Sequence, residues 1–318
     1  MVFLEYIVLA ALVVFFAIRL SYYVDCLDKL SNLSGAFIGG VILAAVTSLP
    51  ELFTSLTAVI ALDEPRLIQG NVLGSNLFNV CVIAGILLVA YKGYQNASLS
   101  KSHKSTLLYG LAMYVTVLLA VMFPISIDLG FININLMTIA ILVIYFINVR
   151  FMKNDDSAAS EEDEEITLTL KQVVIRFVLY AIALVLTSIL LTQVTDRLAE
   201  ELQMGTTVAG ALFLGVATSL PELSASINLV RMKNYNASFG NIVGSNLFNF
   251  IILAFADLIY VKGGVYVNEP QVYNMILFGM CSSILCYLLI VCKNKKWIVM
   301  ACSVGILASY VASIVLSM

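Results

Sequence analysis

The chain has 318 residues, of which 61% are apolar and 12% charged, with a mean hydropathy of +0.99 and a formal net charge of -3 at pH 7. Ordinary soluble domains are roughly 45–50% apolar and about 25% charged, so this composition excludes a soluble globular protein. The small negative charge comes largely from one acidic segment and gives no indication of nucleic-acid binding.

Apolar runs long enough to cross a bilayer recur along the whole chain. A spanning helix needs about 20 predominantly apolar residues. Ten such runs are expected, at residues 2–22, 34–61, 66–91, 106–124, 130–150, 168–194, 206–230, 236–261, 272–292 and 297–317. The first lacks a basic segment before it and a small-residue cleavage site, and Arg19 closes it, so we interpret it as an uncleaved helix. The sequence predicts an all-α polytopic membrane protein with about ten transmembrane helices.

Two segments of the chain occur twice. Residues 39–55 (GGVILAAVTSLPELFTS) match residues 210–226 (GALFLGVATSLPELSAS), and residues 70–79 (GNVLGSNLFN) match residues 240–249 (GNIVGSNLFN). With five spans per half, the second half must enter the membrane from the opposite side. We therefore expect two inverted five-helix repeats, with the substrate site at their interface.

The repeats divide the chain into two halves and a linker. The first half is residues 1–152, with its repeated region at about 34–91, and the second half is residues 168–318, with its repeated region at about 206–261. Between them, residues 153–167 form an acidic linker that contains the run KNDDSAASEEDEE. Charge blocks of this kind are usually disordered, which favours a solvated tether over a regulatory cation sensor.

The Lys and Arg residues predict how the chain is oriented, because cytoplasmic loops collect them. An arrangement with both termini outside leaves only three of the 17 basic residues in outer loops, namely Arg66, Arg197 and Lys262. We therefore expect both termini outside and the linker in the cytoplasm.

Glu51 and Glu222 lie at equivalent positions of the two repeats, in the middle of apolar runs. An ionisable side chain near the bilayer centre costs at least ~2.5–3.5 kcal/mol, so it usually marks an ion site or pathway. Every Lys and Arg is expected in a loop or close to a helix end, which leaves no basic residue to neutralise the two carboxylates. A bound cation or a proton is therefore their expected partner.

Oxygen donors surround both acidic residues. Thr47 and Ser48 precede Glu51 within about one helical turn, and Thr218 and Ser219 precede Glu222 in the same way. Pro50 removes a backbone hydrogen bond and kinks its helix, which frees carbonyls from about Ala44 to Thr47. Calcium takes six to eight oxygen ligands from carboxylates, amides and backbone carbonyls.

The second element of each repeat adds a hydroxyl and an amide on one helix face. These side chains are Ser75 and Asn79 in the first repeat and Ser245 and Asn249 in the second. Glycines four residues apart, at positions 70, 74, 240 and 244, allow close helix contact. We expect these two elements to form walls of the site.

At these residues the chain resembles a known family. The paired T-S-L-P-E-L and G-N-x-x-G-S-N-L-F-N motifs look like the alpha repeats of the sodium/calcium exchanger branch of the cation/calcium exchanger superfamily, including its compact prokaryotic members. The G-N-x-x-E-type signature of the proton/calcium branch is absent. The resemblance implies a prokaryotic plasma-membrane protein.

The resemblance also implies which residues bind ions. A central calcium site would use Thr47, Glu51, Thr218 and Glu222. Flanking sodium sites would use Ala44, Thr47, Ser48, Ser75 and Glu51 on one side and Gly215, Thr218, Ser219, Ser245 and Glu222 on the other. Asn79 and Asn249 would form the polar pair between them. Several members have Asp at the position of Asn249, so the resemblance leaves the ion set and stoichiometry open.

The expected function is secondary-active antiport of Ca²⁺ for Na⁺ by alternating access. The expected partners are the lipid bilayer and inorganic cations, with no cofactor and no nucleic acid, and a monomer is sufficient for transport. Exchange of protons for Ca²⁺ or another divalent cation remains an alternative, because two nearby carboxylates can share protons. A cation channel or a non-transporting membrane interaction protein is the alternative from another class, although paired buried carboxylates favour tight, alternating occupancy over conduction. An enzyme is not expected, since no nucleophile and base pair or cofactor loop is present in the sequence.

Overall fold

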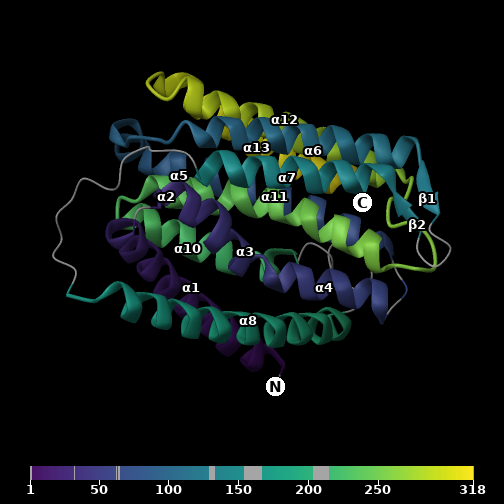
Figure 1. The fold of residues 1–318 in the computed structure, drawn as a ribbon, viewed down its shortest axis with the longest axis horizontal. Coiled ribbons are helices and arrows are strands. Elements are labelled where there is room, and N and C mark those ends of the chain that lie inside the picture. Colours follow the sequence, from purple (N-terminus) through teal and green to yellow (C-terminus); the bar gives the residue numbers. More distant parts are fainter. Residues whose placement is uncertain are drawn as a thin grey trace.

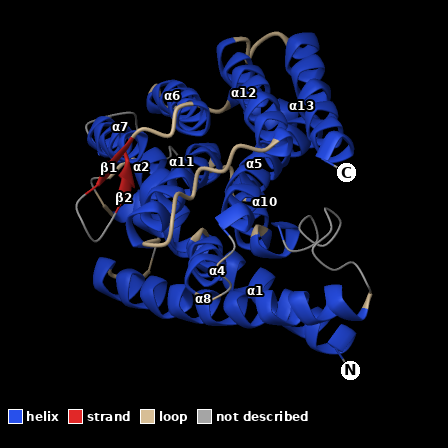
Figure 2. Cartoon of the chain, turned by 90° about the vertical axis from the view of Figure 1, so that its right-hand side faces the viewer, coloured by secondary structure: helices blue, strands red, loops and turns tan. Residues whose placement is uncertain are grey.

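A computed structural model describes residues 2–31, 33–61, 63, 65–128, 133–153, 167–202 and 215–317. It is a bundle of long helices with one small antiparallel hairpin at an end of the bundle (Figures 1 and 2). The helices are α1 (Val2–Leu30), α2 (Gly35–Phe37), the π-helix η1 (Ile38–Leu43), α3 (Ala44–Thr47), α4 (Leu49–Ile60), α5 (Pro65–Asn96), α6 (Ser102–Met122), α7 (Leu136–Lys153), α8 (Leu170–Glu201), α10 (Leu220–Arg231), α11 (Tyr235–Ile259), α12 (Pro270–Val291) and α13 (Lys296–Ser317).

The helices have the length and composition of membrane spans. Within the described residues, eight helices are long and apolar enough to cross a bilayer, and the bent pair Gly35–Thr47 and Leu49–Ile60 makes a ninth. The tenth expected span, residues 206–230, begins outside the described residues, and its second part is α10. Large apolar side chains such as Phe146, Leu179 and Val311 are exposed on the outside of the bundle, as expected for a surface that faces lipid.

Two features differ from the sequence expectation. Arg19 does not close the first helix, because α1 continues to Leu30. The Arg19 side chain is exposed and lies 5.4 Å from the centre of the Phe15 ring, so this guanidinium is not near a helix end as expected. Because the Arg19 side chain is exposed, it lies outside the protein interior. Arg19 therefore does not change the expectation that no basic residue neutralises Glu51 and Glu222.

The second difference is a β-hairpin in a chain expected to be all helical between its loops. Strands β1 (Ser126–Asp128) and β2 (Asn133–Asn135) pair antiparallel, with Ile127 opposite Ile134. Pro124 follows the end of α6 and disfavours further helix, and the alternating Asn-Ile-Asn of β2 suits a strand. The helix expected from residue 130 therefore begins only at Leu136.

The helices are arranged in layers. Helices α1 and α8 pack against each other and form one face of the bundle, whereas α6, α12 and α13 lie at the opposite face (Figures 1 and 2). Helices α5 and α11 contact each other between these layers, together with α3, α4 and α10. The duplicated motifs therefore occupy the interior of the molecule.

The two halves run in opposite directions. The first half contains five spans, namely α1, the bent span, α5, α6 and α7. Because five is an odd number, α8 begins at the end of the bundle opposite to the start of α1, and the second half is inverted relative to the first. Contacts agree with this arrangement, since Arg197 near the end of α8 pairs with Glu5 near the start of α1 at 2.9 Å.

Glycines bring the two repeats into close contact. A Cβ atom added at Gly240 of α11 would lie 2.8 Å from the Ala36 carbonyl oxygen and 2.8 Å from the Gly40 nitrogen. Both of these atoms belong to the backbone, so only glycine fits at position 240 without a shift of the chain. The first element of one repeat thus packs directly on the second element of the other.

Candidate cation site

Both T-S-L-P-E motifs break their helices at the serine. The helices before and after Ser48 are bent by 41°, and Ser48 has φ -90° and ψ 5°. Ser219 has nearly the same conformation, with φ -89° and ψ 6°. In each case proline at the second position of the next helix has no N–H to donate to the preceding turn. The helix break that the sequence predicted from Pro50 is confirmed, and the second repeat reproduces it. The expectation that the break frees the Ala44 carbonyl is wrong, because this carbonyl accepts from the Ser48 N–H at 3.1 Å, as the Gly215 carbonyl accepts from the Ser219 N–H at 3.1 Å.

The two acidic side chains are both buried. Glu51 at the start of α4 and Glu222 at the start of α10 are each 1% exposed. Each accepts a hydrogen bond from the serine of the opposite repeat. The Ser219 hydroxyl donates to Glu51 Oε1 at 3.1 Å, and the Ser48 hydroxyl donates to Glu222 Oε1 at 3.1 Å.

No basic side chain compensates this pair within the described residues. The ion pairs there join Lys29 to Asp25, Arg197 to Glu5 and Lys262 to Asp63. A buried carboxylate without a counter-ion is costly by several kcal/mol. A cation or protons would compensate this pair, and the partner expected from the sequence stays a prediction.

Five buried oxygen atoms of the predicted site have no hydrogen-bond partner among the described residues. They are Glu51 Oε2, Glu222 Oε2, Ser75 Oγ, Asn79 Oδ1 and Asn249 Oδ1. Buried polar atoms are normally hydrogen-bonded, and each exception in a native structure calls for an explanation such as an ion. Carboxylate, hydroxyl and amide oxygens are the ligands of hard cations such as calcium.

Thr47 of the first repeat contacts Ser245 of the second repeat. The Thr47 hydroxyl lies 3.4 Å from the Ser245 hydroxyl and 3.3 Å from the Ala44 carbonyl oxygen. In the second repeat, the Thr218 hydroxyl donates to the Gly215 carbonyl at 3.1 Å. Carbonyls at positions 44 and 215 therefore lie beside the predicted hydroxyl ligands.

The contacts bring most of the predicted residues together. They join Thr47 to Ser245, Ser48 to Glu222 and Ser219 to Glu51. Asn79 and Asn249 each hydrogen-bond to the second element of the opposite repeat. Ser75 is buried on α5, and its hydroxyl has no hydrogen-bond partner within the described ranges.

Two asparagines that the sequence interpretation did not single out anchor the acidic residues. The Asn71 amide donates to the Glu51 main-chain carbonyl at 3.3 Å and to the Ser55 hydroxyl at 3.0 Å. Asn241 does the same for the Glu222 carbonyl at 3.3 Å and the Ser226 hydroxyl at 2.9 Å. The signal was present in the sequence, since both asparagines belong to the repeated G-N dipeptide.

A larger cluster of metal-binding side chains is absent from the described residues. Among the described residues, no group of three or more His, Cys, Asp or Glu side chains has a geometry for metal binding. Asp257 is buried near the end of α11, where it accepts hydrogen bonds from the Asn135 N–H at 2.9 Å and the Thr138 hydroxyl at 2.6 Å. These bonds tie α11 to β2 and α7, and they give Asp257 a structural role.

Comparisons with known proteins agree with this architecture. A family model described as Sodium/calcium exchanger protein matches residues 2–153 and 172–318. Inner membrane protein YrbG of Escherichia coli (strain K12) is 26% identical over 294 residues, which cover 87% of this chain and 86% of YrbG. Sodium/calcium exchanger MaX1 of Methanosarcina acetivorans is 40% identical over 63 residues, or 20% of this chain and 18% of MaX1. The structure of the sodium-calcium exchanger NCX_Mj soaked with 100 mM Na⁺ and 10 mM Sr²⁺ has a TM-score of 0.73 at 21% identity, with 99% of each chain covered.

Broken helices that bring buried carboxylates together inside an inverted repeat define a helical membrane transporter. The chain belongs to the sodium/calcium exchanger family, whose model matches nearly all of it. It is therefore an integral membrane protein of a cation/calcium antiporter family.

Proposed function

We propose that this protein exchanges Ca²⁺ for Na⁺ across the membrane by alternating access. The observation that carries the proposal is the buried Glu51 and Glu222 pair, whose Oε2 atoms have no hydrogen-bond partner among the described residues, like the side-chain oxygens of Ser75, Asn79 and Asn249. This donor set contains only oxygen and carries two formal negative charges. It suits one calcium ion or a group of sodium ions.

Competition for the two carboxylates couples the ions. One Ca²⁺ balances both negative charges, and Na⁺ ions balance them in its place, so occupancy by one ion opposes occupancy by the other. The twelve ligating residues that we propose are those expected from the sequence, with main-chain carbonyls at Ala44 and Gly215. Asn71 and Asn241 hold the two acidic residues in position from α5 and α11.

Access alternates when α1 and α8 move relative to the other helices. These two helices pack on each other as a separate layer (Figures 1 and 2). Near the end of α1, Asp25 and Asp28 accept hydrogen bonds from the Asn234 amide at 2.9 and 3.0 Å. These bonds hold α1 against α11 at one end of the bundle, and we infer that this end is closed to solution.

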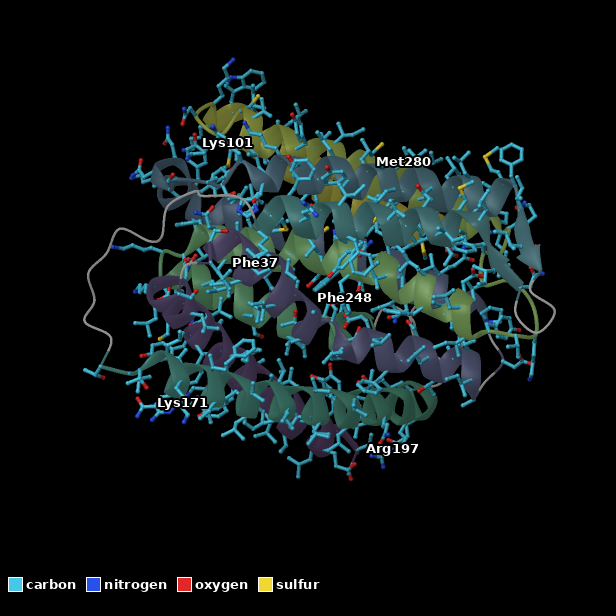
Figure 3. The ribbon with its side chains drawn as sticks, viewed as in Figure 1. Phe37, Lys101, Lys171, Arg197, Phe248 and Met280 are labelled. Atoms are coloured by element: carbon cyan, nitrogen blue, oxygen red, sulfur yellow. The ribbon has the colours of Figure 1, made fainter. Side chains whose placement is uncertain are left out.

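The closed end faces the cytoplasm in our proposal. Lys101 and Lys171 lie toward the same end of the bundle, whereas Arg197 lies toward the other (Figure 3). The loop after α5 also meets the start of α11 there, since the Ser100 N–H donates to Asn236 Oδ1 at 2.8 Å. The positive-inside rule places the Lys-rich end in the cytoplasm, with both termini outside and residues 153–167 inside.

Calcium flux in proteoliposomes tests the ion coupling. The purified chain is reconstituted, and uptake of radiolabelled Ca²⁺ is measured under an imposed Na⁺ gradient alone and under a proton gradient alone. Uptake driven by Na⁺ only supports the proposal. Uptake driven by the proton gradient only identifies a proton/calcium antiporter, and saturable uptake under neither gradient contradicts transport of either kind.

A further inference from the structure

Four asparagines link α5 to α11, the two helices whose Asn71 and Asn241 contact Glu51 and Glu222. Asn76 and Asn246 exchange two hydrogen bonds, from Asn76 Nδ2 to the Asn246 main-chain carbonyl at 3.3 Å and from Asn246 Nδ2 to the Asn76 carbonyl at 3.2 Å. Their side-chain oxygens accept from the other two. Asn249 Nδ2 donates to Asn76 Oδ1 at 2.9 Å, and Asn79 Nδ2 donates to Asn246 Oδ1 at 3.0 Å.

This network fixes which end of each amide is nitrogen and which is oxygen. A main-chain carbonyl can only accept a hydrogen bond, so the atom of Asn76 that faces the Asn246 carbonyl must be Nδ2. The opposite atom of Asn76 is then Oδ1, and the atom of Asn249 that faces it must be Nδ2. The same reasoning, starting from the Asn76 carbonyl, fixes Asn246 and then Asn79.

The free end of both outer amides is therefore oxygen. Asn249 Oδ1 and Asn79 Oδ1 are buried without a hydrogen-bond partner in the described part of the chain, and the residues are each 1% exposed. An amide could otherwise present either its nitrogen or its oxygen, and only the oxygen can ligate a cation. A carboxylate needs no such control, because its two oxygens are equivalent.

We propose that Asn76 and Asn246 are positioning residues that hold Asn249 and Asn79 with their amide oxygens available as neutral cation ligands. The inference rests on the proposed cation site. It explains how the amides of Asn79 and Asn249, one from each repeat, both present an oxygen ligand at the proposed cation site. With neutral ligands from α5 and α11, Glu51 and Glu222 alone set the negative charge of the site.

A double-mutant cycle separates this orienting role from a merely structural one. Asn76→Leu removes the acceptor for Asn249 Nδ2, so the amide is free to turn its nitrogen toward the cation. Residues that orient metal ligands typically change metal affinity by about 10–100-fold when mutated, and we expect a loss of that size in the Kd for Ca²⁺. In an Asn249→Asp background either carboxylate oxygen serves as ligand, and Asn76 Oδ1 faces an oxygen instead of a donor. Asn76→Leu should therefore cause no loss of Ca²⁺ affinity in this background.

The measurement is isothermal titration of the purified full chain in detergent with Ca²⁺, for wild type, both single variants and the double variant. Thermal unfolding of each variant verifies that it is folded. An equal loss of affinity from Asn76→Leu in both backgrounds, or no loss in either, would overturn the inference. The symmetric cycle of Asn246→Leu with Asn79→Asp gives an independent answer if Asn76→Leu does not fold.

Failure of this inference can be told apart from failure of the proposed function. If wild type binds Ca²⁺, and Glu51→Gln and Glu222→Gln abolish binding, the cation site stands whatever the asparagine cycle shows. If wild type binds no Ca²⁺, both the site and the orienting role are overturned.

Discussion

The Ser48 hydroxyl of the first repeat donates a hydrogen bond to Glu222 of the second repeat at 3.1 Å. The equivalent bond runs the other way, from Ser219 to Glu51, at the same length. Each buried carboxylate thus depends on the opposite half of the chain for its hydroxyl donor. The proposed cation site is consequently a property of the interface between the repeats, and neither repeat contains it alone.

This crossed arrangement predicts a specific coupling. A hydrogen bond to a charged group contributes about 1.5–3 kcal/mol, and roughly half as much when the acceptor is neutral. We expect Ser48→Ala to lower the thermal unfolding temperature in wild type and in Glu51→Gln by the same amount. In a Glu222→Gln background, the decrease in unfolding temperature that Ser48→Ala causes should be about half as large.

The control for this cycle is the mirror-image set, in which Ser219→Ala should couple to Glu51→Gln and be additive with Glu222→Gln. Additivity of Ser48→Ala with Glu222→Gln, together with coupling to Glu51→Gln, would contradict the crossed contacts.

The close contact between the repeats at Gly240 gives a second prediction. Gly240→Ala places a Cβ atom 2.8 Å from the Ala36 carbonyl oxygen and the Gly40 nitrogen, and overpacking of this kind typically costs about 1–3 kcal/mol. The matched control is Gly85→Ala in α5, where the added Cβ meets no described atom within 4 Å beyond its own stretch of helix backbone and helix propensity favours alanine by up to about 1 kcal/mol. Thermal unfolding in detergent should show a lower midpoint for Gly240→Ala only. Equal midpoints for the two variants would be inconsistent with the contact.

A third prediction concerns the link between α1 and α11. Asn234→Ala removes the amide that donates to Asp25 and Asp28, which are 4% and 3% exposed. Because hydrogen bonds to charged groups contribute about 1.5–3 kcal/mol each, we expect a clear loss of thermal stability. Asn274→Ala, which removes an exposed bond to the Leu316 carbonyl at 3.4 Å, serves as control and should change stability by about 0.5 kcal/mol or less. Similar losses for both variants would argue against a buried link at Asn234.

The orientation of the chain is tested by labelling single cysteines in a background that lacks the six native ones. We expect cysteines at Lys101 and Arg231, both exposed, to resist a membrane-impermeant thiol reagent added outside intact cells. A cysteine at Lys262, whose side chain is 65% exposed, should react. Labelling of Lys101 and Arg231 positions from outside, with protection of Lys262, would reverse the proposed orientation. If the reagent labels a cysteine at only one of Lys101 and Arg231, the result would contradict the fold.

Much of the site could be predicted from the sequence, because the motifs occur twice. Repetition of T-S-L-P-E identified Glu51 and Glu222 as equivalent, and the proline in each motif predicted the helix break that the structure has at Ser48 and Ser219. Spacing along a helix shows which side chains share a face. It does not show which helix lies opposite, so the pairing of Ser48 with Glu222 could not be read from the sequence.

The supporting residues were missed for a similar reason. Asn71 and Asn76 lie inside the repeated G-N-x-x-G-S-N motif, but their roles depend on partners in α4 and α11 that only the fold brings close. The length of α1 was also underestimated. Arg19 looked like the end of an apolar run, yet an exposed arginine is compatible with helix, and the helix continues to Leu30.

Transport by variants of the two acidic residues tests the central claim most directly. Na⁺-driven uptake of radiolabelled Ca²⁺ is measured in proteoliposomes that contain wild type, Glu51→Gln or Glu222→Gln. Glu5→Gln, an exposed acidic residue paired with Arg197, is the matched control. The amide retains the volume of the side chain but removes the charge that balances a divalent cation. We predict that both site variants fold and lose Ca²⁺ uptake, while Glu5→Gln retains it. Uptake at the wild-type level in either Glu51→Gln or Glu222→Gln would contradict the proposed site.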